Sequence, residues 1–264
     1  MTMPEFLTPV TTDSDALEVA LLSHVGVVRQ HNEDSIAGDA EMGVLVLADG
    51  MGGCRGGEVA SALATGLVMK KLRAKLDTEG QAVCEQLWQA VSAANLAIYQ
   101  TAEKFNQYEG MGTTLIAARF YGQQQLCIAH IGDSRMYRWR NGTLTQLTVD
   151  HTVLQEQIDG GLISPEEARL SFGRGLITRA LGVEPEVDID IIEQQAKADD
   201  IYLLCSDGLF DMVSEDDITR ILGASVKGLA LAAKALVDRA NQRGGYDNIS
   251  VVLAKVANHA TGYG

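Results

Sequence analysis

The chain has 264 residues, enough for one large globular domain or for two small ones. Its composition, 46% hydrophobic and 21% charged, is typical of an ordinary folded protein and excludes a disordered one. Lys and Arg number 21 against 35 Asp and Glu, and the resulting net charge of −14 argues against a nucleic-acid-binding surface or a site for anionic membranes.

No apolar segment approaches the roughly 20 residues that a membrane-spanning helix needs. Residues 1–16 hold no Lys or Arg and no apolar stretch, unlike a signal peptide. Four cysteines without C-x-x-C spacing are spread along the chain: Cys54, Cys84, Cys127 and Cys205. Buried free thiols fit a reducing compartment better than a disulfide framework, so we expect a cytoplasmic protein.

In chain order, residues 1–17 combine Pro, Thr and Ser with little periodicity and predict a flexible tail. A first strand is expected near residues 19–22. The strand that ends at Asp49 leads into a glycine-rich turn. Apolar side chains then recur at helical spacing and predict two helices, over about residues 58–76 and 81–105.

Four short strands are expected next, over residues 113–120, 125–131, 136–140 and 144–147. The Asn141-Gly142 pair between the last two is a strong signal for a β-hairpin.

Residues 150–182 depart from this alternation of strands and turns. Ser164 and Glu167 form a capping box with Pro165 at the first helical position, and four glycines flank it. We expect a short helical insertion with mobile joints.

The remaining segments are a strand near residues 187–194, a strand that ends before Asp207, a short helix capped by Ser214, a helix over about residues 226–242, and a final strand. No repeat or linker is evident, so residues 18–258 are expected to form one domain.

The expected helices are grouped between and after runs of strands, which indicates an α+β layering and not a parallel βαβ wind. Several strands are apolar on both faces, as in two packed sheets that are each covered by helices. The prediction is a four-layer α/β/β/α sandwich of two mixed, mainly antiparallel sheets.

Aspartates stand at the ends of the most apolar strands. Asp49, Asp133 and Asp207 each follow an apolar run, and Asp247 precedes one. If the last strand runs antiparallel to the others, all four side chains lie at one rim. Carboxylates gathered there would repel one another and lose hydration unless a cation sits among them. Hard divalent ions with oxygen ligands, Mg²⁺ or Mn²⁺, fit such a set.

Two ions that share a carboxylate can activate water at neutral pH. Asp49 is the natural bridge, Gly50 could offer its carbonyl, and Asp207 and Asp247 would complete the first metal site. These four positions are the expected ligands of the metal centre.

Three residues upstream suit supporting roles. Glu33 and Asp34 would orient metal-bound water. Arg29 supplies the cation that the site otherwise lacks, and its planar fork can hold two oxygens of a phosphate.

Each of these signals has a structural alternative. A single Asp-Gly pair most often marks a turn, and only the conjunction of four such aspartates with Arg29, Glu33 and Asp34 argues for a site. His130 lies inside a strand and is expected to be a core residue. His151 is left open between a structural role and a place in the wall of the site.

The chain resembles the metal-dependent protein phosphatases, the type 2C serine/threonine phosphatases, and above all their bacterial branch. The resemblance runs from about residue 19 to residue 256. It rests on motifs in family order: Val27 to Asp34, Ala48 to Gly53, Gly57 to Ala60, Gly112 to Thr114, Gly132 to Arg135, Leu176 to Gly182, Ser206 to Leu209, and Asp247-Asn248.

The resemblance implies that Asp49 bridges two Mn²⁺ or Mg²⁺ ions, with the Gly50 carbonyl, Asp207 and Asp247 as further ligands, and that Arg29 binds the substrate phosphate. It also implies a weaker third metal, held by Asp133 together with Asp207. Residues 150–182 correspond to the mobile flap of the family, which influences the choice of substrate.

Cys54 stands where the bacterial motif commonly has a histidine, a departure that puts the proton donor in doubt. Cys54 is therefore a candidate catalytic residue, with a spectator thiol as the alternative.

The function that follows is hydrolysis of phosphoserine and phosphothreonine in signalling proteins by metal-activated water, in opposition to a serine/threonine kinase. A non-catalytic phosphoprotein-binding regulator and a hydrolase of small phosphate esters are the alternatives. The intact set of Asp49, Asp207 and Asp247 disfavours the regulator, while the choice between protein and small-molecule substrates stays open.

Overall fold

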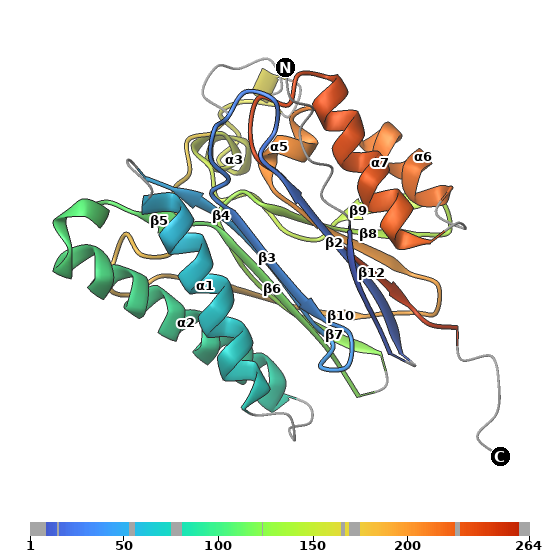
Figure 1. Ribbon diagram of the computed structural model, residues 1–264, viewed down its shortest axis with the longest axis horizontal. Coiled ribbons are helices and arrows are strands. Elements are labelled where there is room, and N and C mark those ends of the chain that lie inside the picture. The colour runs from blue at the N-terminus through green and yellow to red at the C-terminus, as the bar shows by residue number, and fades with distance from the viewer. Residues whose placement is uncertain are drawn as a thin grey trace.

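The computed structural model describes residues 9–14, 16–52, 56–74, 81–122, 124–164, 167–168, 175–224 and 228–258. Within them, two sheets pack face to face (Figure 1). The first sheet has the order β1 (Val10–Asp13), β2 (Leu17–His24), β12 (Ile249–Val256), β11 (Ile201–Cys205), β8 (Arg135–Arg140) and β9 (Thr143–Gln146). The second has the order β10 (Asp190–Gln195), β7 (Gln125–Ile131), β6 (Leu115–Tyr121), β4 (Val44–Met51) and β3 (Asp34–Asp39), with β5 (Gly112–Thr113) paired to β4.

Helices cover the outer face of each sheet (Figure 1). The second sheet is covered by α1 (Gly56–Arg73) and α2 (Gln81–Lys104), and the first by α6 (Glu215–Gly223) and α7 (Leu229–Gln242). The short helices are η1 (Asn106–Tyr108), α3 (Val153–Asp159) and α5 (Asp207–Phe210). None of the helices in the described ranges is long and apolar enough to cross a membrane.

Strand β4 shows why four layers form. Its successive side chains point to opposite faces of the sheet, so Val44 and Val46 pack under α1 and α2, while Leu45 and Leu47 enter the core between the sheets. A third apolar core lies under α6 and α7. The predicted α/β/β/α sandwich is therefore confirmed.

Every strand pairing in the described ranges is antiparallel, so the expected mixture of strand directions is absent there. The predicted hairpin joins β8 to β9, and both Asn141 (φ 51°) and Gly142 (φ 84°) adopt the left-handed conformation that such a tight turn needs.

The prediction of a loose tail up to residue 17 is wrong for part of that segment. Val10–Asp13 forms β1, which pairs with β2 at the edge of the first sheet. Four residues with two threonines give no visible periodicity, so only the pairing with β2 reveals the strand. Residues 1–8 lie outside the described ranges.

The insertion over residues 150–182 contains α3 and the predicted capping box. Ser164 Oγ accepts from Glu167 N (3.2 Å), and Glu167 Oε2 accepts from Ser164 N (2.8 Å). The insertion returns to the body of the domain through two isolated bridges, Thr152 with Ile177 and Thr113 with Leu181. Residues 165–166 and 169–174 lie outside the described part.

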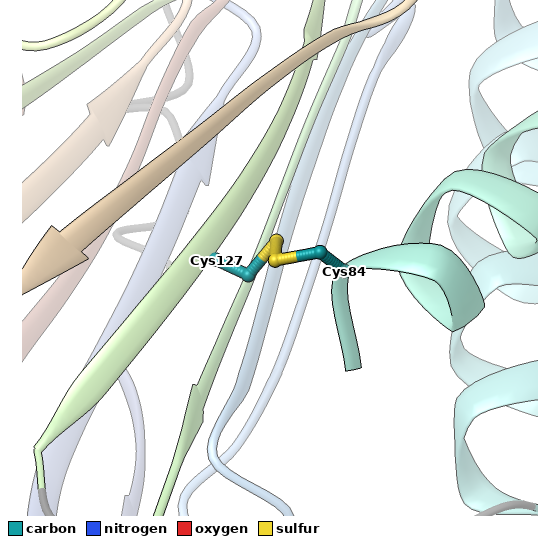
Figure 2. Close-up of a disulfide and its surroundings, with 2 residues drawn as sticks. All are labelled: Cys84 and Cys127. Carbon is teal, nitrogen blue, oxygen red and sulfur yellow. A yellow bond between two sulfur atoms is a disulfide. The ribbon is translucent and has the colours of Figure 1, made fainter. Parts of the chain in front are cut away.

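The cysteines depart from the expectation of free thiols. Cys84 on α2 and Cys127 on β7 form a disulfide between helix and sheet (Figure 2). Both side chains are buried in the apolar core under α1 and α2, whereas Cys205 is free and buried in the first sheet. The spacing of 43 residues gives no hint of this pairing, which depends on how α2 lies on the sheet.

Reduction of this disulfide is expected to lower the melting temperature. Closing a loop of 43 residues restricts the unfolded chain by roughly 4 kcal/mol in the chain-entropy account. Thermal melting with and without dithiothreitol, after unfolding and refolding in each buffer, measures the effect. Cys84→Ala/Cys127→Ala is the control and should melt alike in both buffers. A wild-type protein that melts at the same temperature in both would contradict the cross-link.

Candidate active site

The aspartates selected from the sequence meet at one end of the sandwich. Strands β11 and β12 run antiparallel, with Cys205 opposite Val251, so Asp207 after β11 and Asp247 before β12 share an end. The same end receives Asp49 from β4 and Asp133, which follows β7. This confirms the expected orientation of the last strand, and α5, which begins at Asp207, lies at the upper end of the sheets in Figure 1.

Asp34 and Asp49 occupy directly opposed positions in the ladder between β3 and β4. Such side chains lie within about 5.5 Å at Cβ, and two carboxylates there repel each other. Burial raises the pKa of Asp34 to about 6. Burial, followed by the charge of Asp34, raises the pKa of Asp49 well above its usual value.

Asp207 and Asp133 extend the cluster. Burial, followed by the charges of Asp133 and Asp247, raises the pKa of Asp207 to about 8. Burial, followed by the charge of Asp150, raises the pKa of Asp133 to about 6. Asp211 contributes to both shifts. It was not among the predicted site residues, although it follows Asp207 by one helical turn, a spacing that could have pointed to it.

Two buried oxygens test whether this set fits a cation. Asp34 Oδ2 accepts from Ser206 Oγ (2.8 Å), but Asp34 Oδ1 and Asp207 Oδ1 are buried and have no hydrogen-bond partner among the described residues. Unpaired carboxylate oxygens are costly inside a protein, and a hard cation satisfies them. The donor set therefore fits Mg²⁺ or Mn²⁺.

A different group gathers more tightly. Among the described residues, the ligand atoms of His130, His151 and Asp190 lie within 4.8 Å of one another. His151 Nδ1 accepts from Gly132 N (3.1 Å), so the ring proton sits on Nε2, which faces Asp190 Oδ2 at 3.1 Å. Arg179 Nη1 donates to Asp190 Oδ1 (3.1 Å). A metal at Nε2 would have to displace a proton and a guanidinium, so this group is a hydrogen-bonded support.

His151 thereby joins two parts of the site. Its backbone N–H donates to Gly132 O, and its carbonyl accepts from Thr178 N in the returning arm of the insertion (both 2.8 Å). His130 is a core residue, as expected, with Nε2 facing Ser134 O at 3.1 Å.

Gly50 is required by packing. A Cβ at this position would lie 2.1 Å from Gly57 O in the first turn of α1 and 2.6 Å from Glu33 O. The Gly50 N–H donates to Glu33 O (3.1 Å), which fixes the turn against the strand before it. The sequence indicated only that Gly50 could offer its carbonyl to a metal. The structure gives a second reason for glycine here, because α1 leaves no room for a side chain.

Hydroxyl groups hold the Asp49 turn from the other side. Thr114 Oγ1 accepts from Asp49 N (3.0 Å) and is hydrogen-bonded to Ser134 Oγ (2.7 Å). Thr113 Oγ1 donates to Asp49 O (2.8 Å). The motif of residues 112–114 therefore links the end of β4, at Asp49, to the turn that carries Asp133.

Arg29 contacts a predicted metal ligand. Its Nη2 donates to Asp247 Oδ2 at 2.7 Å, and both side chains are partly exposed. The sequence placed Arg29 on the substrate phosphate and did not reveal this ion pair, because the two residues are 218 positions apart.

Asn248 fixes the loop that carries Arg29 and Glu33. Its Oδ1 accepts from Glu33 N (2.8 Å), and its Nδ2 donates to Val25 O (3.0 Å) and His31 O (2.9 Å). The Asn248 amide is buried and makes three hydrogen bonds to the backbone of this loop. Burial raises the pKa of Glu33, with contributions from Asp247 and Glu58, while Arg29 opposes the rise. Cys54, the remaining candidate, lies outside the described residues.

The sequence and the fold are similar to those of known protein phosphatases. The family model described as "Protein phosphatase 2C" matches residues 24–238, and the chain belongs to this family.

Among its relatives, the serine/threonine protein phosphatase PstP of Mycobacterium tuberculosis is 44% identical over 246 residues, which are 93% of this chain and 46% of PstP. The chain thus spans about half the length of that relative. The serine/threonine phosphatase stp of Listeria monocytogenes is 39% identical over 236 residues, 87% of this chain and 92% of stp. The solved structure of the PstP catalytic domain in complex with two manganese ions has a TM-score of 0.82 at 43% identity, and the match covers 92% of this chain and 99% of that domain.

The raised carboxyl pKa values predict how stability depends on pH. A carboxyl that titrates higher in the folded chain favours folding while it is protonated, and this stabilisation is lost as pH rises through the folded-state value. The values of about 6 for Asp34 and about 8 for Asp207 predict that the metal-free protein melts at lower temperature at about pH 8.5 than at about pH 6.5. Mn²⁺ should recover most of the loss, because it favours the ionised carboxylates.

Calorimetry at both pH values, with and without Mn²⁺, makes this measurement. Desolvation lowers the pKa values of His24, His130 and His151, which act in the opposite direction only below about pH 6.5. Asp207→Asn is the matched control and should weaken the pH dependence. A metal-free wild type whose melting temperature is flat or rises over this interval would refute the prediction.

Proposed function

We propose that the chain is a serine/threonine protein phosphatase that depends on divalent metal ions and hydrolyses phosphoserine and phosphothreonine in proteins. The observation that carries this proposal is the cluster of buried carboxyls with unpartnered oxygens at one end of the sandwich, beside Arg29. Membership of the protein phosphatase 2C family and the names of the relatives support it.

In this proposal, Asp49 and the Gly50 carbonyl would hold two Mn²⁺ or Mg²⁺ ions together with Asp207 and Asp247. Asp133 would hold a weaker third ion with Asp207. The two manganese ions in the PstP structure support the number of principal ions. When bound, such ions lower the pKa of water and neutralise charge on a phosphate.

The chain's own residues would align the reactants. Asp34 Oδ1 has no partner among the described residues and is free to accept a hydrogen bond from the attacking water, while Ser206 fixes Oδ2. Glu33 would orient water from the neighbouring loop. Water is the proposed nucleophile, so the reaction needs no phosphoenzyme intermediate.

Arg29 would bind the phosphate through its planar guanidinium. In this structure the guanidinium balances the charge of Asp247. A cation at Asp247 would take over that balance and leave Arg29 to the substrate. The ion pair thus couples phosphate binding to metal binding.

We further propose that residues 18–258 form a single catalytic domain with the flap at about residues 150–182, and that a serine/threonine kinase opposes the enzyme. A cytoplasmic location is part of the proposal. The Cys84–Cys127 disulfide weighs against it, because disulfides are rare in reducing compartments.

The first test is metal-dependent catalysis. Purified protein should hydrolyse p-nitrophenyl phosphate and phosphothreonine peptides with Mn²⁺ or Mg²⁺, and EDTA should abolish both activities. Asp207→Asn and Asp247→Asn should bind metal more weakly and lose about 100-fold or more in turnover, because each removes a charge that a dication needs. Calorimetric metal titration separates lost binding from lost folding. Activity that survives complete metal removal would overturn the mechanism.

The second test separates Arg29 from the metal centre. Arg29→Ala should raise KM for phosphorylated substrates, and it should lower kcat if the contact with phosphate strengthens in the transition state. Metal affinity should not fall, since the variant removes a cation that competes for Asp247. Arg73→Ala, which removes an exposed ion pair with Asp39, is the control. Weakened metal binding by Arg29→Ala would contradict the assignment.

A further inference from the structure

A cavity of about 1000 Å³ lies between α2 and residues 177–188, which comprise the returning arm of the insertion and the segment after it. One wall is a face of α2, with Trp88, Ser92 and Leu96 at a spacing of four residues. The other wall is formed by residues 177–180 and 183–188. Met51 also lines the cavity. None of these residues has a role in the proposed metal or phosphate sites.

The α2 wall exposes large apolar side chains that its packing does not require. Trp88 is 42% exposed and Leu96 43%, while the helix packs on the sheet through other residues, among them Leu87, Val91 and Ala94. Val183 faces them from the opposite wall and is 57% exposed. Apolar side chains that gather on both sides of a cavity favour an apolar ligand group.

The opposite wall is held rigidly. The buried amide of Asn95 accepts from Gly182 N (2.7 Å) and donates to Glu184 O (3.0 Å) and Pro185 O (3.1 Å). Gly182 has φ 88°, and a Cβ there would lie 2.2 Å from Ile98 Cγ2. The groove therefore exists before any ligand binds.

This wall is also acidic. Glu184, Glu186 and Asp188 line the cavity and are exposed to solvent. The Arg179 guanidinium, which also lines it, is paired with Asp190. The uncompensated charge in the described part of the groove is therefore negative and complements a basic ligand.

The groove adjoins the metal-binding turn. Met51 follows Asp49 by two residues and pairs with Gly112. Leu181, at the base of the acidic wall, pairs with Thr113, whose hydroxyl donates to Asp49 O. These contacts place the groove beside the end of β4 that carries Asp49.

We propose that this groove binds the segment of a phosphoprotein substrate next to the phosphorylated residue. A bulky apolar side chain of that segment packs between Trp88, Leu96 and Val183, and a Lys or Arg pairs with Glu184 and Glu186. The proposal rests on the proposed phosphatase function and adds the substrate class, phosphorylated sites with a basic and an apolar residue nearby.

Charge reversal tests the proposal. Phosphoserine peptides carry one Leu and either an Arg or a Glu at each flanking position in turn. Wild type should hydrolyse the best Arg peptide about three- to tenfold more efficiently, in kcat/KM, than its Glu counterpart, as expected for one or two exposed ion pairs. Glu184→Lys/Glu186→Lys should reverse that preference. Both residues are exposed and accept substitution without loss of the fold.

A second variant tests the apolar contact. Trp88→Ala should lower the ratio of kcat/KM for the Leu-bearing peptide to kcat/KM for p-nitrophenyl phosphate, also by about three- to tenfold, because truncation removes apolar surface from the contact. Leu231→Ala is the control, since Leu231 is also a large, exposed apolar side chain (56%) but lies on α7, on the other face of the molecule. This control should leave the ratio unchanged.

The outcomes separate the two proposals. If wild type hydrolyses the peptides but the charge-reversed variant keeps the wild-type preference, the groove is refuted and the phosphatase function stands. If Trp88→Ala behaves like Leu231→Ala, the apolar contact is refuted. A wild type that hydrolyses p-nitrophenyl phosphate but no phosphopeptide overturns both the protein-substrate assignment and the groove.

Discussion

Several buried carboxyl groups lie close together at one end of the sandwich, and the rest of the site depends on holding them there. Asp34 and Asp49 face each other across one strand pair, and Asp207 joins them from the other sheet. Among the described side chains the counter-charge is only partial, since Arg29 forms its ion pair with Asp247 and Arg135 forms one with Asp150. Packing and hydrogen bonds therefore hold these carboxyl groups together against their mutual repulsion. A cation bound among them would reduce that repulsion.

Neighbouring polar groups fix the backbone segments that carry the acidic side chains. The Thr114 and Ser134 hydroxyls fix the end of β4 at Asp49, and the Asn248 amide fixes the loop that brings Glu33 to it. Gly50 lets this end of β4 lie against the first turn of α1. Because these groups belong to both sheets and to α1, the geometry of the rim depends on three of the four layers being assembled.

Much of this could be read from the sequence, for identifiable reasons. A buried strand is an apolar run, and an Asp-Gly that terminates it must lie at a strand end, so β4, β11 and the rim position of their aspartates followed. The antiparallel course of β12 was needed to bring Asp247 to the same rim, and the register of Cys205 with Val251 provides it. The outline of the fold and the gathering of these aspartates at one rim were thus accessible from local patterns.

What the sequence could not reveal depends on contacts between distant segments. Strand β1 is too short and polar to show a period. The pairing of Arg29 with Asp247 and that of His151 with Asp190 exist only once segments that are distant in the sequence meet in the fold. Asp211 looks like an ordinary surface acid until α5 turns it toward Asp207 and Asp133.

The Cys84–Cys127 bond closes part of the backbone into a covalent ring, which contains most of α2, all of η1, β5 and β6, and the start of β7. The surface turn near Phe105 and Gly110 lies within that ring. A protease that cuts this turn opens the ring but does not separate the pieces. The fragment with Asp49 and the fragment with Asp207 stay joined through sulfur, so a nicked molecule keeps both halves of the proposed metal centre until it meets a reductant.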